Sequence, residues 1–197
     1  MTTSIERITP WLERAGKHIM GPGHYKLASG QHSQYIIDMK GIPPYVEDVI
    51  REMIVQTYNA RTVDIVVGVP NGGTSFAEFI APALSMNTQN PDGVRQVRME
   101  KRGRSFFLPI VPKAGLRALV VDDVGTTYGS ILEACKVLEE AGVEVAHRFV
   151  IINRNPNPRA AEAAGIEFLE HYPIPTYASA SCRMCKRGIP LVDPNAA

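Results

Sequence analysis

Residues 119–138 read LVVDDVGTTYGSILEACKVL, and this stretch decides which fold the chain is expected to adopt. It begins with the continuous apolar run LVV, which is typical of a strand buried on both faces. Two carboxylates, Asp122 and Asp123, follow at the expected end of that strand, and a turn of small or hydroxylated residues comes next. The last part has the apolar spacing of an amphipathic helix, with Ile131, Ala134, Cys135 and Leu138 on one face. The stretch therefore predicts a strand, an acidic pair, a turn and a helix, a repeating unit of α/β proteins.

The order of these parts suits a phosphorylated sugar. In open α/β sheets, ligands bind outside the carboxyl ends of the strands, where this turn is expected. Backbone N–H groups at the start of the following helix favour a phosphate, and Thr and Ser hydroxyls add donors. Asp122 and Asp123 can accept hydrogen bonds from sugar hydroxyls or hold a hydrated Mg²⁺. The plain alternative is a strand–turn–helix capped by Thr or Ser, which many α/β proteins contain.

The combination resembles the 5-phosphoribosyl-1-pyrophosphate (PRPP) motif of the type I phosphoribosyltransferases. The resemblance implies that Asp123 is catalytic and that the acidic pair holds Mg²⁺ indirectly, through PRPP and water. Two residues depart from the family pattern. Tyr128 stands where the family almost always has glycine, which leaves open whether it blocks or merely lines the phosphate pocket, and Gly125 stands where a branched apolar residue is more common. The implied PRPP-binding run is Asp122, Asp123, Val124, Gly125, Thr126, Thr127, Tyr128, Gly129 and Ser130.

Composition is ordinary for a globular protein and excludes several classes. The chain has 197 residues, 45% of them hydrophobic and 21% charged, enough for one domain or one domain with a small appendage. A net charge of +1 gives no global field toward nucleic acid or membrane. No stretch approaches the roughly 20 apolar residues of a membrane helix, and residues 1–11 lack the apolar core of a signal peptide. Three cysteines do not make a disulfide framework, so we expect a cytoplasmic protein.

A second strand–turn–helix pattern spans residues 63–84. Its apolar run 65–67 is followed by a glycine-rich turn, in which glycines permit close backbone approach. By itself this turn is a weak signal; by resemblance it is the family's pyrophosphate loop, with Asn71, Gly72 and Gly73 as the binding residues. The chain has no GxxxxGK(S/T) and no GxGxxG after a strand, which argues against a P-loop nucleotide hydrolase and a dinucleotide-binding fold.

Residues 94–117 hold a dense cationic cluster. A solvated loop or a nucleic-acid patch is the alternative, but a mobile cationic loop beside a pyrophosphate site would neutralise the leaving group and exclude water. The cluster resembles the family's catalytic loop. This implies Lys101 and Arg98 as catalytic and PRPP-binding residues, with Arg102 also binding PRPP. In the family the loop often reaches into the partner's site, so a homodimer is implied, and which subunit's site the loop serves stays open.

Recognition of the base is assigned to two segments. Residues 23–41 resemble the N-terminal segment of the orotate phosphoribosyltransferases, which implies Lys26, Tyr35 and Ile36, with Thr126, as base-binding residues. Residues 35–39 are expected to form a strand. Without the resemblance, Tyr35 and Ile36 would be assigned to the hydrophobic core. Arg154 follows an expected strand at 149–152, and its guanidinium can fork onto the orotate carboxylate. An exposed arginine in a loop is the competing interpretation.

The tail carries Cys182 and Cys185 in a CxxC motif. A zinc site usually needs four ligands, and the sequence shows no second pair nearby. The context of a thioredoxin-like motif is also missing. The tail resembles the C-terminal CxxCxxGxPL of one branch of the orotate phosphoribosyltransferases, and the sequence gives no physical account of its purpose beyond an expected structural role.

These observations predict an α/β fold of the type I phosphoribosyltransferase kind, with a central, mostly parallel sheet of about five strands flanked by helices. We expect a single domain over 1–197, with a small N-terminal hood (1–45), a core (46–170) and a C-terminal tail (171–197). The resemblance implies a glycosyltransferase (pentosyltransferase) of pyrimidine (UMP) biosynthesis that converts orotate and PRPP to orotidine 5′-phosphate and pyrophosphate with Mg²⁺. The alternatives are a phosphoribosyltransferase for another base, in purine or pyrimidine salvage, and a non-catalytic regulator that binds PRPP or a nucleotide.

Overall fold

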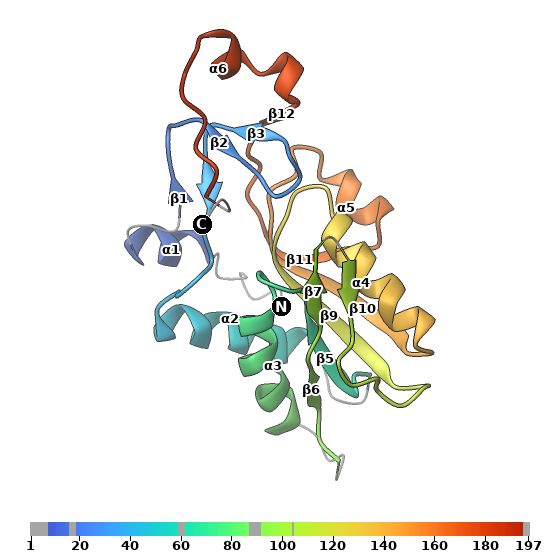
Figure 1. The fold of residues 1–197 in the computed structure, drawn as a ribbon. Helices are drawn as coiled ribbons and strands as arrows, with labels where there is room; N and C mark the ends of the chain where they lie inside the picture. Colours follow the sequence, from blue (N-terminus) through green and yellow to red (C-terminus); the bar gives the residue numbers. More distant parts are fainter. Residues whose placement is uncertain (1–7, 16–18, 59–61, 87–91, 104, 195–197) are drawn as a thin grey trace.

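Five parallel strands form the central sheet of the computed structural model, which describes residues 8–15, 19–58, 62–86, 92–103 and 105–194 (Figure 1). The expected parallel five-stranded sheet is therefore confirmed. The strands lie in the order β11 (Glu167–His171), β10 (Glu144–Asn153), β9 (Arg117–Gly125), β5 (Ile65–Gly68) and β6 (Arg95–Val97).

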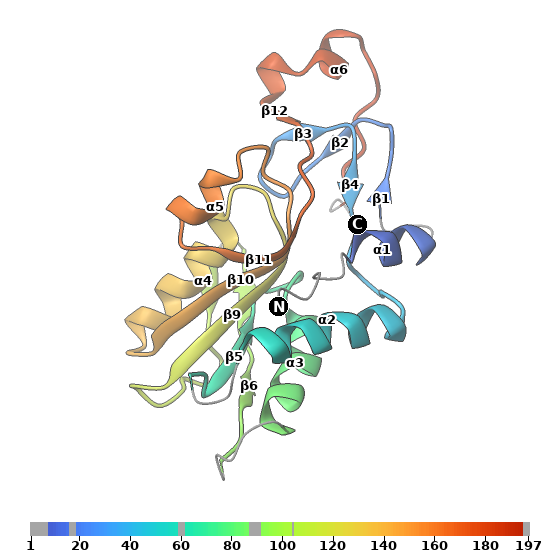
Figure 2. The same cartoon turned by 180° about the vertical axis from the view of Figure 1, so that it is seen from behind.

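Helices cover both faces of this sheet (Figures 1 and 2). Two long helices lie on one face, α2 (Pro44–Thr57) and α3 (Thr74–Met86), and the other face is covered by α4 (Gly129–Glu140) and α5 (Arg159–Ala163). Successive strand residues point to opposite faces, so each apolar run supplies both cores. Val66 and Leu119 belong to the cluster on the α2–α3 side, whereas Val67 and Val120 belong to the cluster on the α4–α5 side.

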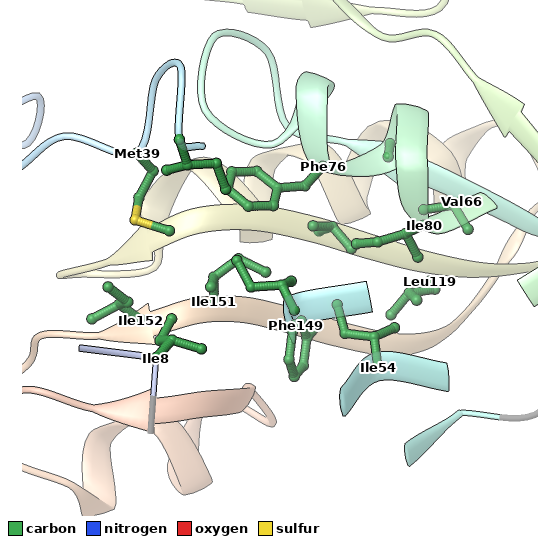
Figure 3. Close-up of a cluster of buried hydrophobic side chains, with 14 of the residues drawn as sticks. Ile8, Met39, Ile54, Val66, Phe76, Ile80, Leu119, Phe149, Ile151 and Ile152 are labelled. Atoms are coloured by element: carbon green, nitrogen blue, oxygen red, sulfur yellow. The ribbon is translucent and has the colours of Figure 1, made fainter. Parts of the chain in front are cut away.

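The larger core lies between the sheet and α2 and α3. Figure 3 shows Phe76 and Ile80 of α3, Leu119 of β9, Phe149 of β10 and Ile54 of α2 in this cluster. All five side chains are at most 2% exposed. Burial on both faces explains why the sheet strands read as continuous apolar runs rather than as alternating ones.

The N-terminal hood and the C-terminal tail form one small unit above the sheet (Figures 1 and 2). A two-stranded antiparallel sheet pairs β1 with β4, and a three-stranded sheet has the order β12-β3-β2, so the tail supplies a strand to the hood. The hood elements are α1 (Thr9–Ala15), β1 (Ile19–Met20), β2 (Tyr25–Lys26), β3 (His32–Ser33) and β4 (Ile36–Ile37). The tail elements are β12 (Thr176–Tyr177), the 3₁₀ turn η1 (Ser179–Ser181) and α6 (Arg183–Lys186).

Three local expectations differ from the structure. The acidic pair lies inside β9 rather than after it, because pairing with β10 continues to Asn153↔Gly125. The expected strand at 35–39 is reduced to Ile36 and Ile37, since its antiparallel partner β1 is only two residues long. The cationic segment contains β6 and an antiparallel hairpin of β7 (Glu100–Arg102) and β8 (Ser105–Phe107) instead of an irregular loop; Arg104 lies outside the described residues.

Among the described residues, no helix has the length and apolarity needed to cross a membrane.

The sheet core gives a direct stability prediction. Leu119 has no exposed surface, so Leu119→Ala should lower the free energy of unfolding by about 2–5 kcal/mol through lost burial and a residual cavity. Leu132, 40% exposed on α4, is the matched control, and Leu132→Ala should stay within about 0.5 kcal/mol of wild type. Urea unfolding measures both; equal losses would contradict the assignment of Leu119 to the core.

Candidate active site

The acidic pair is open to a ligand because β9 extends beyond the end of its neighbour β5. Pairing between β5 and β9 ends at Gly68↔Val121, whereas pairing between β9 and β10 continues to the last residue of β9. One edge of β9 is therefore free of a strand partner from Asp122 onward. The chain leaving β5 turns across this edge, and Val69 N–H donates to Val121 C=O at 2.8 Å. The glycine-rich turn is thus held directly beside the two carboxylates.

Contact between this turn and the acidic pair demands glycine. A Cβ on Gly72 would lie 2.5 Å from Asp123 Oδ1 and 2.6 Å from Asp122 Oδ1. A Cβ on Gly73 would collide with the Val121 carbonyl oxygen. Asn71 adopts a left-handed conformation with φ 73°, which asparagine tolerates better than most residues. The sequence-predicted pyrophosphate loop therefore lies against the predicted ribose-binding acids.

The electrostatics of the pair favour a ligand that can donate hydrogen bonds or bring positive charge. Burial raises the pKa of Asp122 well above its usual range, and the neighbouring Asp123 carboxylate raises it further. Burial also raises the pKa of Asp123. Hydrogen bonds offset part of this rise in pKa: Asp123 N–H donates to Asp122 Oδ1 at 3.0 Å, and Val124 N–H donates to Asp123 Oδ1 at 2.7 Å. A hydrogen bond with the Asp122 side chain also lowers the pKa of Asp123. Sugar hydroxyls or a hydrated cation would relieve the repulsion.

The start of α4 offers donors for an anion. Tyr128 is the N-cap residue and makes no side-chain cap hydrogen bond, so no side chain from that position occupies the first amides of the helix. A Cβ on Gly129 would have only Thr127 Oγ1 within 4 Å, at 3.8 Å, so the space before the helix is open. An N-terminus with free amides and open space is a ready anion site.

Tyr128 turns away from that space. Its side chain is 6% exposed and packs in the hydrophobic cluster beneath α4, and its hydroxyl donates to Asn153 Oδ1 at 2.7 Å. The ring covers Gly125, where a Cβ would lie 2.7 Å from Tyr128 Cε1. The two departures from the family pattern therefore explain each other: a tyrosine folded inward at 128 leaves room only for glycine at 125. Tyr128 borders the anion space and does not fill it.

Arg154 is buried, which contradicts the alternative of an exposed loop arginine. Its side chain is 2% exposed, and its Nη2 donates to Ser33 Oγ at 2.9 Å and to the Tyr35 carbonyl at 3.3 Å. Its Nε has no hydrogen-bond partner, and the structure records no ion pair between it and any described carboxylate. Burial lowers the pKa of Arg154 to about 10, so the group stays charged at neutral pH. A buried charge without a counter-ion is costly, and this one faces a cavity.

Two adjoining cavities meet at the acidic pair. The first, about 190 Å³, lies under the hood and is bordered by Ile36, Asp123 and Arg154. The second, about 340 Å³, lies at the start of α4. Both are bordered by Leu27, Ala28, Val124 and Thr126, so they form one continuous site. The second cavity is lined by every residue of the predicted PRPP-binding run except Asp123. These are Asp122, Val124, Gly125, Thr126, Thr127, Tyr128, Gly129 and Ser130.

Several predicted site residues do not border either cavity. Lys26 pairs with Asp193 at 2.8 Å, and Tyr35 contributes its backbone carbonyl to Arg154 rather than its ring to the cavity. Gly72 adjoins the acids and Gly73 lies against the Val121 carbonyl. Neither of them, nor Asn71, lines the two cavities.

The predicted catalytic cations also lie outside the two cavities. Arg98 is paired with Glu100 at 3.0 Å, and the cations of Lys101 and Arg102 lie over Phe106 and Phe107 of the same hairpin. Within one chain, these three cations therefore contact residues of their own segment and not the two cavities.

The structure adds residues that the sequence interpretation missed. Asp38 and Lys40 border the cavity under the hood, and Ser33 holds Arg154. A carboxylate inside the apolar run YIID was the available signal for Asp38, since a charge there is unusual in a core strand. The tail cysteines also have a second ligand pair after all: His24 and His32 of the hood lie beside Cys182 and Cys185.

Comparisons with known proteins agree on one family. Residues 43–166 match the family described as "Phosphoribosyl transferase domain". Orotate phosphoribosyltransferase of Sulfolobus acidocaldarius is 33% identical over 162 residues, covering 80% of this chain and 79% of that protein. That of Thermotoga maritima is 31% identical over 188 residues, covering 93% and 94%. The crystal structure of orotate phosphoribosyltransferase from Aeropyrum pernix superposes with a TM-score of 0.62 at 24% identity, covering 83% of this chain and 93% of that one.

The packing of Tyr128 on Gly125 predicts coupled stability effects. Gly125→Val should lower the free energy of unfolding by about 1–3 kcal/mol, because the new side chain meets the tyrosine ring. In a Tyr128→Gly background the same change should be better tolerated, with a coupling of at least about 0.5 kcal/mol by urea unfolding. Additive losses would show that the two positions are independent.

The half-buried acidic pair predicts that removal of a carboxylate changes stability in a pH-dependent way. The folded protein holds a proton on Asp122 more tightly than the unfolded chain does, so ionisation at higher pH weakens the fold. Asp122→Asn should therefore raise the Tm at pH 8, and the gain should shrink as the pH falls toward about 4. The control is Asp48→Asn, at an exposed carboxylate paired with Arg51 on α2, which should change the Tm little. A gain that grows toward acid pH would contradict the raised pKa.

Proposed function

The chain belongs to the phosphoribosyl transferase family, and we propose that it is an orotate phosphoribosyltransferase, which joins orotate to PRPP to give orotidine 5′-phosphate and pyrophosphate. This is a pentosyl transfer of pyrimidine (UMP) biosynthesis. The observation that carries the choice of base is Arg154, a buried guanidinium that faces the cavity under the hood and has no ion pair with a carboxylate of the described residues.

The base fits this cavity by charge and by shape. Orotate carries a carboxylate, and a guanidinium binds a carboxylate with short, charge-assisted hydrogen bonds. Ser33 and the Tyr35 carbonyl hold Nη2 of Arg154, and the guanidinium borders the cavity under the hood, where it would meet the ligand. Ile36 and Thr126 border the same space and supply an apolar face and a hydroxyl. An adenine or guanine ring has no carboxylate and would leave the arginine uncompensated.

PRPP would span the junction of the two cavities. Its 5′-phosphate would lie at the start of α4, bound by the free amides and the hydroxyls of Thr126, Thr127 and Ser130. Its ribose hydroxyls would donate to Asp122 and Asp123, and its pyrophosphate would face the turn at 71–73. The turn touches the acids, so the ribose and the leaving group would be bound by adjacent parts of the chain.

The acidic pair also fits a magnesium ion. Its oxygens are hard ligands, they are crowded together, and their raised pKa values mark a site that a cation would stabilise. Asp122 and Asp123 would hold Mg²⁺ through water and the ribose hydroxyls. When bound, Mg²⁺ would neutralise charge on the pyrophosphate as it leaves.

The chain's own residues would then guide the transfer. The ring nitrogen of orotate, having lost its proton, forms a bond to the anomeric carbon while the bond to pyrophosphate breaks and the pyrophosphate keeps the electron pair. Positive charge develops on the ribosyl centre, where the carboxylates of Asp122 and Asp123 stabilise it. Arg154 fixes the ring so that its nitrogen faces this carbon.

The leaving pyrophosphate needs cations, and the described ones of the predicted catalytic segment do not border the two cavities of their own chain. Lys101 and Arg102 lie on the β7–β8 hairpin, Arg98 lies just before it, and none of the three borders either cavity. We assign them to the catalysis of pyrophosphate departure within a homodimer, in which the hairpin of one subunit serves its partner's site. Their exposure, with 75% of the Arg98 side chain accessible, leaves them available for such a contact.

Arg154 supplies the test of the proposed activity. Pyrophosphate release from PRPP with Mg²⁺ should occur with orotate and not with adenine, guanine or uracil. Arg154→Gln should raise the KM for orotate by at least about tenfold, the value of a charge-assisted hydrogen bond, and should change the KM for PRPP far less. Arg51→Gln, at an exposed position on α2, is the matched control.

Each rival function has its own outcome in this assay. Turnover with a purine would assign the chain to another base. PRPP binding by calorimetry without turnover on any base would identify a regulator.

A further inference from the structure

Four metal-binding side chains meet where the hood joins the tail. Each of His24, His32, Cys182 and Cys185 offers one ligand atom, and these four atoms all lie within 4.8 Å of one another. The histidines come from the start of the chain and the cysteines from its end. His24 and His32 are 3% and 4% exposed and Cys182 is fully buried, while Cys185 is the accessible member.

Four of the six separations between ligand atoms are close to those of a tetrahedral zinc site. With Zn–N of about 2.0–2.1 Å and Zn–S of about 2.3 Å, a tetrahedron has N···N edges of about 3.3 Å and N···S edges of about 3.6 Å. His24 Nε2 lies 3.0 Å from His32 Nδ1 and 3.6 Å from the sulfur of each cysteine. The Cys185 sulfur lies 3.2 Å from His32 Nδ1. These four separations depart from the ideal by a few tenths of an ångström at most.

A hydrogen bond outside the cluster also orients one histidine for metal binding. His24 Nδ1 donates to the Ile189 carbonyl at 2.7 Å, which fixes the tautomer that leaves the Nε2 lone pair directed at the cluster. A histidine that binds a metal almost always donates its other ring N–H in this way. Two thiolates would balance the charge of a divalent cation, so the buried centre would be neutral. A Cys₂His₂ set in tetrahedral array is typical of zinc.

The segments around the cluster, residues 21–35 and 175–194, have little apolar core to hold them together. Within the described residues, neither of the two hydrophobic clusters includes a buried residue from 21–35 or 175–194. The unit is joined by short strands, by the pairing of Tyr25 with Val192 and by the exposed Lys26–Asp193 ion pair. Small units without a sufficient core are usually held by disulfides or metals.

We propose that His24, His32, Cys182 and Cys185 bind one zinc ion, which fastens the tail to the hood and holds the base-binding arginine in place. The second part rests on the proposed function. His32 is followed directly by Ser33, whose Oγ accepts from Arg154 Nη2 at 2.9 Å and donates to the Pro175 carbonyl at 3.0 Å. His32, a ligand of the proposed zinc, is adjacent in sequence to Ser33, which orients Arg154. The zinc would therefore position Arg154 through these residues without touching the substrate.

Metal content tests the site without any assay of turnover. The full chain, purified under reducing conditions from zinc-supplied cells, should contain one zinc per chain by mass spectrometry. Even a changed outer contact costs about 10–100-fold in metal affinity, so Cys182→Ser, Cys185→Ser and His24→Gln should each lose the stoichiometric zinc. Cys135→Ala and His147→Gln, at a cysteine and a histidine outside the cluster, should retain it.

The absorption spectrum of the cobalt-substituted protein identifies the type of ligand and the geometry of the site. The Co²⁺-loaded chain should show the intense visible bands of a tetrahedral site and a thiolate-to-metal charge-transfer band, and the charge-transfer band should weaken in Cys185→Ser. A wild-type chain that holds no zinc and carries a Cys182–Cys185 disulfide would overturn the site. Zinc retained unchanged in the cysteine variants would overturn it as well, because the metal would then be bound elsewhere.

A kinetic comparison tests the positioning role. Removal of zinc should raise the KM for orotate several-fold, with a smaller change in the KM for PRPP, and added zinc should restore it. Equal kinetics with and without zinc would overturn the positioning role and leave the metal site standing. If no base is turned over, the proposed function fails, whereas zinc content and the cobalt spectrum still decide the site.

Discussion

The unequal length of two neighbouring strands underlies the whole site. β5 ends at Gly68, whereas β9 continues for four residues past the last residue that pairs with β5. That overhang is held on one side only, by β10, and it carries both carboxylates. The chain leaving β5 can then cross the free edge and bring a glycine turn against the acids. Without the overhang, Asp122 and Asp123 would face a hydrogen-bonded neighbour strand instead of an open cavity.

The site also shows how a family pattern can change at two positions together. A glycine at position 128 would adopt the left-handed conformation without strain, yet the residue there is a tyrosine with φ 61°. The inward ring gains burial and a hydrogen bond to Asn153, a residue that also accepts from Asn155 N–H at 3.0 Å. These contacts offset backbone strain of order 1 kcal/mol. The loss of a side chain at Gly125 is what makes this packing possible.

The sequence predicted the parts of the protein whose signals are local. The apolar runs of β5, β9 and β10 and the spacing of α4 identified the sheet and the PRPP motif, because burial on two faces and helical periodicity are visible within a few residues. The burial of Arg154 was not decided by sequence, since its partners Ser33 and Tyr35 lie in a distant segment. The histidines that complete the tail's CxxC were missed for the same reason. Contacts between distant segments leave no periodic signal.

The tail's position in the hood has a consequence for how the protein is made. Ser33 and Pro175 touch although they lie 142 residues apart, and Pro194 borders the cavity under the hood. During synthesis, the hood emerges from the ribosome long before the strand and cysteines that complete it. The sheet can assemble on the growing chain, but the cavity under the hood closes only once residues 175–194 have emerged. Nascent chains should therefore acquire a folded core well before they acquire a substrate site.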